Sequence, residues 1–209
     1  MMVWIDASAP AARLKVFGLT VTERHLQALL RLEPKPTKII IDTGATDPAT
    51  LKIPASVTSR LPIAWSRSTA PFAVRMGQAR AEAGAESLLL LDGIALGDQR
   101  LHGQLARSDA NLAVFAPDSN EGVAMLFVRA GTELPATDKS ADLIALAKSM
   151  VSNGAAKQLT QESFDGFIRK LRRSLPFYLF RIGDDAAAAK VQRFLFWSNY
   201  KGSTDLFTR

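Results

Sequence analysis

The segment Ser87-Leu88-Leu89-Leu90-Leu91-Asp92-Gly93 decides the fold that the sequence predicts. Four consecutive leucines followed by a turn signal are typical of a β-strand that is buried on both faces. Such strands lie at the centre of parallel sheets that are covered by helices on both sides. The segment therefore predicts an α/β domain with Asp92 at the carboxyl end of a central strand, where open α/β sheets bind their ligands.

The rest of the chain alternates apolar runs with amphipathic segments. Thr22 is the expected N-cap of the first helix, and Pro34 and Pro36 follow its end. This alternation predicts a doubly wound, mostly parallel sheet flanked by helices. Strands are expected at residues 3–6, 38–42, 62–65, 87–93, 111–116, 123–128 and 177–182, with a turn at 117–120, and helices at 22–32, 71–83, 98–108, 138–151, 161–173 and 184 to about 197.

Composition limits the class of protein. The 209 residues suit one large domain, and 47% hydrophobic with 22% charged residues is ordinary globular composition. The absence of cysteine excludes disulfides, zinc thiolate sites and cysteine nucleophiles. No signal peptide and no apolar run of membrane-spanning length are found, so we expect a soluble, cytoplasmic chain. The net charge of +6 fits either a moderately basic surface or an anionic partner.

Several chemistries have no support in the sequence. His25 and His102 are the only histidines, too few for a zinc site without cysteine. No G-x-S-x-G and no G-x-x-x-x-G-K-[ST] motif occurs. Nothing beyond net charge favours nucleic-acid binding. The late aromatic residues are expected in the core or on a face that meets a partner domain or membrane: Phe177, Tyr178, Phe180, Phe194, Phe196, Trp197 and Tyr200.

Four segments carry a family resemblance. Residues 7–14 (Ala-Ser-Ala-Pro-Ala-Ala-Arg-Leu) follow the first strand, and residues 18–26 (Gly-Leu-Thr-Val-Thr-Glu-Arg-His-Leu) open the first helix. Residues 88–101 contain the central strand, and residues 180–185 read Phe-Arg-Ile-Gly-Asp-Asp. This succession resembles the GT-A type nucleotidyltransferases, especially sugar-phosphate and inositol-phosphate cytidylyltransferases. The resemblance implies a GT-A, nucleotidyltransferase-like fold over most of the chain.

The resemblance also implies nucleotide-binding positions at Ser8, Arg13, Lys15, Asp92 and Gly93. The two basic residues are otherwise solvated surface groups, and Asp92 is otherwise the cap of its own turn. The catalytic residues remain unknown. If the domain is active, the family's mechanism implies CTP with Mg²⁺, held by Asp92 and Asp184 as substitutes for the family's ligands after a register shift. If it is not active, no cofactor is expected.

The sequence departs from the family where its chemistry is concentrated. The first loop has no glycine between residues 7 and 17, and Pro10 removes one backbone donor. Glycine is favoured there because the backbone must approach the phosphates closely. The family's metal-binding aspartates would fall near Ile94 and Gly183. We therefore expect a fold that was retained after its nucleotidyl transfer was lost; the alternative is an active Mg²⁺-dependent cytidylyltransferase that makes a CDP-alcohol from CTP and a phosphorylated polyol.

The last ten residues give the expected context. Residues 200–209 (Tyr-Lys-Gly-Ser-Thr-Asp-Leu-Phe-Thr-Arg) are similar to the junction that precedes a membrane CDP-alcohol phosphatidyltransferase domain in bifunctional proteins. This implies a nucleotidyltransferase-like domain at 1–197 and a junction at 198–209, at the inner face of a membrane. Candidate partners are a nucleotide, the membrane domain of the same parent chain and a second copy of the chain, with no nucleic acid.

Overall fold

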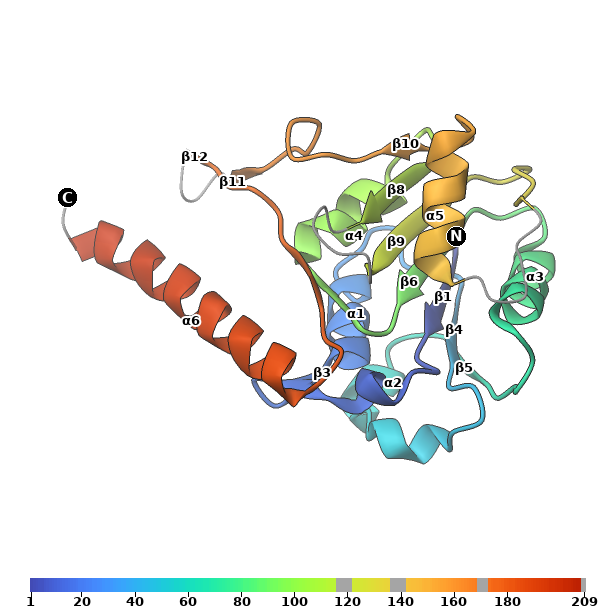
Figure 1. The fold of residues 1–209 in the computed structure, drawn as a ribbon, viewed down its shortest axis with the longest axis horizontal. Helices are drawn as coiled ribbons and strands as arrows, with labels where there is room; N and C mark the ends of the chain where they lie inside the picture. Colours follow the sequence, from blue (N-terminus) through green and yellow to red (C-terminus); the bar gives the residue numbers. More distant parts are fainter. Residues whose placement is uncertain (116–121, 136–141, 169–172, 208–209) are drawn as a thin grey trace.

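The computed structural model describes residues 1–115, 122–135, 142–168 and 173–207 (Figure 1). One seven-stranded sheet has parallel pairing at its centre, between β1 and its neighbours β4 and β6, and antiparallel pairing of β9 with β6 and β8. This confirms the predicted doubly wound, mostly parallel α/β fold. In sheet order the strands are β10 (Lys157–Gln158), β8 (Leu112–Phe115), β9 (Ala124–Val128), β6 (Leu88–Asp92), β1 (Met2–Asp6), β4 (Lys38–Asp42) and β5 (Ile63–Ser66).

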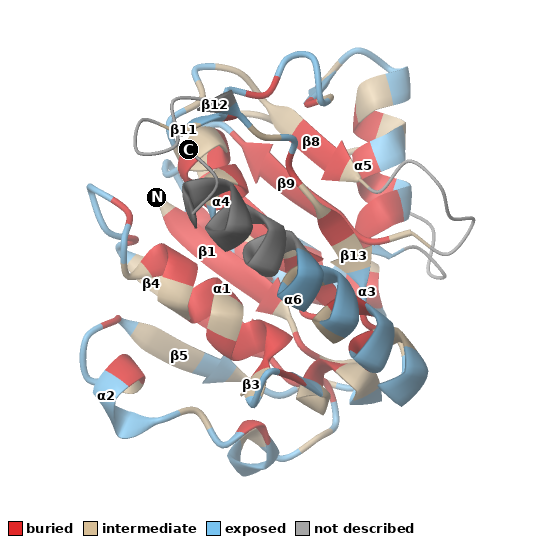
Figure 2. Ribbon diagram, turned by 90° about the vertical axis from the view of Figure 1, so that its left-hand side faces the viewer, coloured by how far each residue is buried: buried red, intermediate tan, exposed pale blue. Residues whose placement is uncertain are grey.

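Helices cover both faces of this sheet because successive strand residues point to opposite sides. Val3 and Ile5 face α1 (Val21–Leu29) and α4 (Gln99–Ala106) in one core. Met2 and Trp4 face α3 (Phe72–Ala83) and α5 (Leu143–Ser152) in the other. Strands β1 and β9 are coloured as buried over most of their length in Figure 2. Burial on both faces explains why the leucine run of β6 contains no polar residue before Asp92.

Short elements connect and extend this framework. A small third core joins the start of α6 to the body through Val16, Leu96, Ile182, Ala188 and Val191, and the rest of α6 projects away from the sheet (Figure 1). No helix in the described part of the chain is long and apolar enough to cross a lipid bilayer. The short elements are η1 (Pro10–Arg13), β2 (Lys15–Val16), β3 (Leu19–Thr20), η2 (Pro48–Leu51), α2 (Ala55–Thr58), β7 (Ala95–Gly97), β11 (Phe167–Ile168), β12 (Arg173–Ser174) and β13 (Leu179–Arg181), and the long helix α6 (Asp185–Phe207) follows them.

The N-cap of α1 corrects one prediction. Thr20, and not Thr22, caps the helix: its hydroxyl accepts a hydrogen bond from the Glu23 N–H at 3.1 Å. The Glu23 carboxylate in turn accepts one from the Thr20 N–H at 2.6 Å. This capping box satisfies two backbone donors at once, and so it fixes the helix start at Val21.

The helix predicted at residues 161–173 is wrong over its described part. Residues 161–168 form turns and the short strand β11, which pairs with β12. Asp165 accepts a hydrogen bond from the Phe167 N–H at 3.2 Å, which makes an Asx turn. Gly166 then lies so close to Leu175 that a Cβ there would be 2.4 Å from the Leu175 carbonyl oxygen. Turn chemistry therefore outweighs the helical spacing, while residues 169–172 lie outside the described chain.

Two other helices differ in length from the prediction. The helix predicted at 138–151 is α5, which begins at Leu143 with Asp142 as its N-cap; residues 138–141 and the predicted turn at 117–120 lie outside the described residues. Helix α6 continues to Phe207 instead of ending near Trp197, and so it spans both sides of the predicted boundary between domain and junction.

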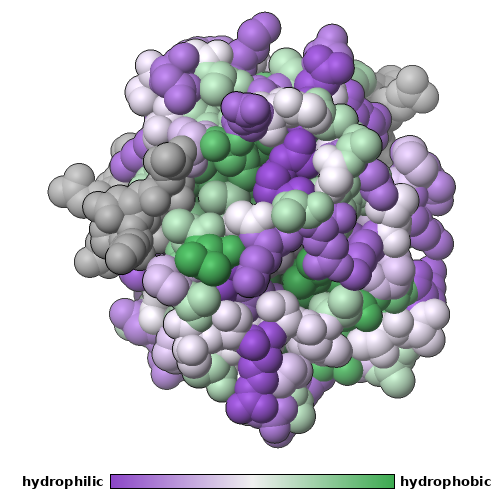
Figure 3. Space-filling view, turned by 90° about the vertical axis from the view of Figure 1, so that its right-hand side faces the viewer, coloured by the Kyte–Doolittle hydropathy of each residue, from purple (hydrophilic) through white to green (hydrophobic). Residues whose placement is uncertain are grey.

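The face of the molecule seen in Figure 3 is a mosaic of hydrophilic and apolar side chains.

The carboxyl ends of β1 and β6 are joined at Gly93. The Gly93 N–H donates a hydrogen bond to the Asp6 carbonyl at 2.8 Å. A Cβ at this position would lie 2.4 Å from the same oxygen and 2.8 Å from the Ala7 Cα, both of them backbone atoms that cannot rotate away. Gly93 is therefore required for the close approach of the two strands.

Replacing Gly93 with alanine should destabilise the protein by roughly 2–4 kcal/mol, because the backbone of β1 or β6 must shift to remove the clash. Urea unfolding followed by circular dichroism measures this. Gly77→Ala is the matched control: Gly77 is exposed in α3 with no atom within 4 Å of an added Cβ. The control should gain up to about 1 kcal/mol of helix stability. Equal stability of the two variants would contradict the close-approach role.

Candidate functional site

The candidate site lies where the strand order reverses. The chain passes from β1 outward to β4 and β5, and then returns to place β6 on the other side of β1. The crevice outside the carboxyl ends at such a reversal is where open α/β sheets bind ligands. Three aspartates end these central strands in one register, with Asp6 opposite both Asp42 and Asp92.

Arg75 neutralises two of these carboxylates. It extends from α3, and its Nη1 donates to Asp42 Oδ2 at 2.8 Å and lies 3.3 Å from Asp6 Oδ1. Its guanidinium also lies over the Trp4 ring, 5.9 Å from the centroid. Burial alone would lower the pKa of Arg75, but Asp6 and Asp42 outweigh burial and the net pKa is raised. Because Asp42 is fully buried, its carboxyl group needs a polar partner inside the protein, and this guanidinium supplies one.

Asp92 is in a different electrostatic state. Burial raises its pKa to about 7; a hydrogen bond from the Ile94 N–H opposes this shift, and the nearby charges of Asp6 and Asp142 add to it. The positive charge of Arg181 lowers the pKa again, but by less. Near neutral pH the Asp92 side chain is therefore divided between its acid and carboxylate forms.

A cavity of about 440 Å³ opens beside these groups. Its volume is within the range of pockets that bind small molecules. Phe72 and Leu143 supply apolar lining from α3 and α5. Carboxyl, hydroxyl and guanidinium groups are thus gathered around one concave space at the carboxyl edge of the sheet. The polar side chains that line it are those of Asp6, Ser8, Arg75, Asp92, Asp142 and Arg181.

The structure brings together three of the residues singled out from the sequence. Ser8 lines the cavity, and its hydroxyl donates to Asp6 Oδ1 at 2.6 Å. Asp92 lines the cavity, and Gly93 forms the strand junction directly after it. Asp184 does not line the cavity; its carboxylate accepts from the Ala187 N–H at 2.7 Å, in the first turn of α6.

The two basic residues from the resemblance lie elsewhere. The Arg13 guanidinium donates to Thr50 Oγ1 at 2.9 Å and to the carbonyls of Ala7 and Ala9 at 3.4 and 3.0 Å. Lys15 is exposed in the β2–β3 hairpin, and its carbonyl accepts from Gln192 of α6. Neither side chain lines the cavity. Arg13 instead joins the loop after β1 to Thr50 and to carbonyl groups of the same loop.

The residues present do not fit a divalent metal ion. Among the described residues, no three histidine, aspartate or glutamate side chains are grouped closely enough to hold one. One oxygen of Asp6 and one of Asp42 contact Arg75, and Asp92 is partly protonated near pH 7. Mg²⁺ prefers ionised oxygen ligands that no other cation already engages.

A buried histidine pair supports the Asp92 turn from behind. Since the Asp92 carbonyl only accepts, His25 Nε2 donates to it at 3.1 Å. His25 Nδ1 then accepts from His102 Nε2 at 2.9 Å. Burial lowers the pKa of His25 to about 4 and that of His102 to about 3, so both rings are neutral at physiological pH. These contacts make the two rings a buried pair that joins α1 to α4.

The comparisons with known proteins agree with this fold. No protein-family model matches the chain, and no curated protein sequence matches it. Among solved structures, it is similar to a crystal structure of a protein from Bacillus anthracis assigned as a glucose-1-phosphate thymidylyltransferase, with sucrose bound. The TM-score is 0.63 at 8% sequence identity, over 93% of this chain and 95% of that one. The chain therefore has a nucleotidyltransferase-like fold.

The state of Asp92 predicts a pH dependence of stability. Its pKa is near 7 in the folded protein and near 4 in the unfolded chain, so between these values the folded state binds more protons. Its contribution to stability is therefore present at low pH and is lost as pH rises towards 7. Asp92→Asn should gain roughly 1–3 kcal/mol relative to wild type between pH 5 and pH 8, measured by urea unfolding.

Glu162→Gln is the control for this measurement because Glu162 is exposed and remote from the cavity. Its stability relative to wild type should stay constant across the same pH range. If Asp92→Asn followed wild type in parallel from pH 5 to pH 8, the raised pKa of Asp92 would be refuted.

Proposed function

We propose that this chain is a degenerate nucleotidyltransferase-like domain of the GT-A type, which retains a ligand cleft but does not transfer nucleotides. The observation that carries the proposal is the Arg75 bridge between Asp6 and Asp42. Nucleotidyl transfer joins two anionic reactants, and it needs unpaired positive charge or a metal where negative charge develops. Here the Arg75 guanidinium is already paired with two carboxylates.

The loop after β1 supports the same proposal. A phosphate-binding loop directs free backbone N–H groups at its ligand. In this chain the Ala7 N–H donates to the Asp42 carbonyl and the Ser8 N–H to the Asp6 side chain. The N–H groups of Ala12 and Leu14 donate within η1, and Pro10 has none. Most of the loop's donors are thus engaged inside the protein.

The cleft still has the volume and chemistry for a small polar ligand. Asp92 and Asp142 can accept hydrogen bonds from hydroxyl groups, while Phe72 provides an apolar surface. The competing function is an active cytidylyltransferase, in which CTP and Mg²⁺ would bind together and Asp92 would be ionised. The two functions differ in whether Mg²⁺ strengthens nucleotide binding.

Isothermal titration of the protein with CTP, with and without MgCl₂, distinguishes these functions. We expect Mg²⁺ to change any CTP affinity by less than about threefold, since no group of three acidic or histidine side chains in the described chain could hold the ion. We also expect no pyrophosphate release with CTP and a phosphorylated polyol. Micromolar, Mg²⁺-dependent CTP binding that is lost in Asp92→Asn but kept in Glu162→Gln, with pyrophosphate release, would establish the active enzyme instead.

We further propose that the domain works beside a CDP-alcohol phosphatidyltransferase, at the cytoplasmic face of a membrane. The support is the resemblance of residues 200–209 to the junction before such membrane domains. Helix α6 runs without interruption from Asp185 into this segment. The domain would then organise or dimerise the neighbouring enzyme, or supply it with a ligand held in the cleft.

The reading frame that follows Arg209 tests this association. We expect apolar membrane spans and the aspartate-rich signature of the phosphatidyltransferases. A stop codon directly after Arg209, with no such gene beside it, would remove the lipid context and would leave the cleft proposal unaffected.

A further inference from the structure

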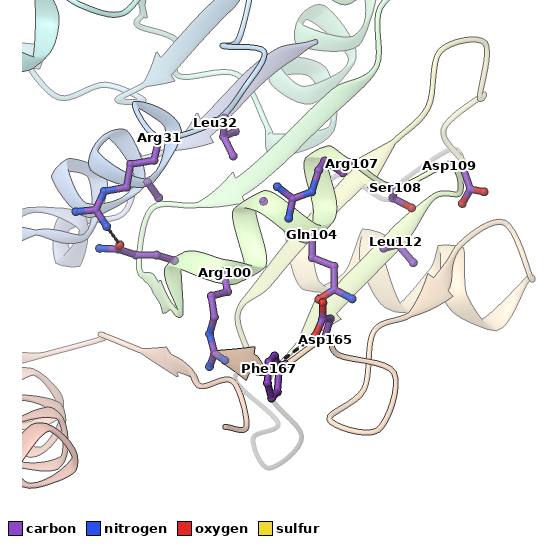
Figure 4. A pocket seen from close by; sticks show the side chains of 13 residues that line it. Arg31, Leu32, Arg100, Gln104, Arg107, Ser108, Asp109, Leu112, Asp165 and Phe167 are labelled. Atoms are coloured by element: carbon purple, nitrogen blue, oxygen red, sulfur yellow. Dashed lines mark hydrogen bonds between the residues drawn. The ribbon is translucent and has the colours of Figure 1, made fainter. Parts of the chain in front are cut away.

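A second concave site lies at the opposite edge of the sheet from the cleft. A groove of about 590 Å³ runs between the carboxyl end of α1 and the length of α4 (Figure 4). Leu112, the first residue of β8, lies in it, which places it towards the amino ends of the central strands. No residue that lines this groove also lines the cleft beside Asp92.

Arg107 is a cation of this groove that lacks a counter-charge in the described chain. Among the described residues, its guanidinium makes no ion pair and no hydrogen bond. The guanidinium lies against Gly103, one turn earlier in α4, where an added Cβ would be 3.3 and 3.4 Å from Nη2 and Nη1. The absence of a side chain at Gly103 therefore lets Arg107 lie along the helix surface inside the groove (Figure 4).

Arg31 adds a second positive charge from α1's side of the groove. Its guanidinium donates to the Gln99 side-chain oxygen (Figure 4), and no carboxylate of the described chain lies within ion-pair distance of it. A neutral amide orients this arginine without cancelling its charge. Both arginines thus keep their charge for a ligand.

The remaining wall of the groove is fixed in place by Arg100. Its Nη2 pairs with Asp98 Oδ2 at 2.6 Å, and its Nη1 donates to the carbonyls of Gly166 and Leu175 at 2.9 and 3.1 Å. These bonds tie Gly166 and Leu175 to α4, and Phe167, the residue after Gly166, is 55% exposed. A fixed wall reduces the ordering that a ligand must impose when it binds.

Two acidic side chains limit what the groove can accept. Asp109 and Asp165 also line it, and neither pairs with an arginine of the described chain. A polyanion such as a nucleic acid strand would meet these carboxylates, whereas one compact phosphate can stay near the arginines. We propose that this groove binds a phosphate monoester, with the phosphate on Arg107 and an uncharged or aromatic group towards Phe167.

Titration with phenyl phosphate tests the proposal, because this probe joins one phosphate to one ring. Isothermal titration should give saturable binding that is tighter than that of inorganic phosphate, since the ring adds an apolar contact. Arg107→Gln should raise the Kd about tenfold, as expected when a charge-assisted contact is lost. Arg31→Gln should raise it less, and Gly103→Ala should also raise it by displacing the Arg107 guanidinium without removing charge.

Arg60→Gln is the matched control, because Arg60 is exposed, has no ion pair among the described residues and lies outside the groove. It should leave the Kd unchanged, and so should Asp92→Asn, which separates this result from the proposed function of the cleft. Circular dichroism confirms that each variant folds. The proposal is refuted by absence of saturable binding, by equal losses in Arg60→Gln and Arg107→Gln, or by tighter Arg107-dependent binding of a short oligonucleotide than of phenyl phosphate.

Discussion

The pairing of Arg75 with Asp6 and Asp42 is the interaction on which the candidate cleft depends. Two carboxylates end neighbouring strands in the same register, and one of them is fully buried. Without a cation between them their mutual repulsion and desolvation would oppose the packing of β1 beside β4. The guanidinium removes this conflict and ties α3 to the carboxyl edge of the sheet. It thereby sets both the shape of the cleft and its unsuitability for a metal ion.

The fold of this chain therefore indicates one class of protein, whereas the side chains of its site argue against the reaction of that class. The sheet order and the likeness to a solved thymidylyltransferase structure define a nucleotidyltransferase-like fold. Function depends on the site built upon a fold, not on the fold itself. In this site the Arg75 guanidinium, which could otherwise stabilise developing negative charge, is paired with two carboxylates. The backbone N–H groups of Ala7 and Ser8 donate to other groups of the protein. These local bonds, and not the topology, are the basis for proposing a binding domain without transfer activity.

The sequence predicted the sheet well because its strands are continuous apolar runs that end in polar residues. The same reasoning located Asp92 and Gly93, but it overlooked Asp6 and Asp42, although each also ends a strand. Arg75 was not predictable from local pattern, since its role depends on how α3 docks across the sheet. In residues 161–168 the spacing of apolar residues predicts a helix, but the Asp165–Gly166 turn determines the structure instead.

Helix α6 gives the molecule the geometry of a lever arm. Its base rests on a small patch around Leu96 and Ile182, while the rest projects from the body (Figure 1). At 1.5 Å per residue, its 23 residues extend about 34 Å, so a tilt of about 10° at the base would move the far end by about 6 Å. A small change in the orientation of the helix where β7 and β13 support it would therefore produce a large displacement of its carboxyl end.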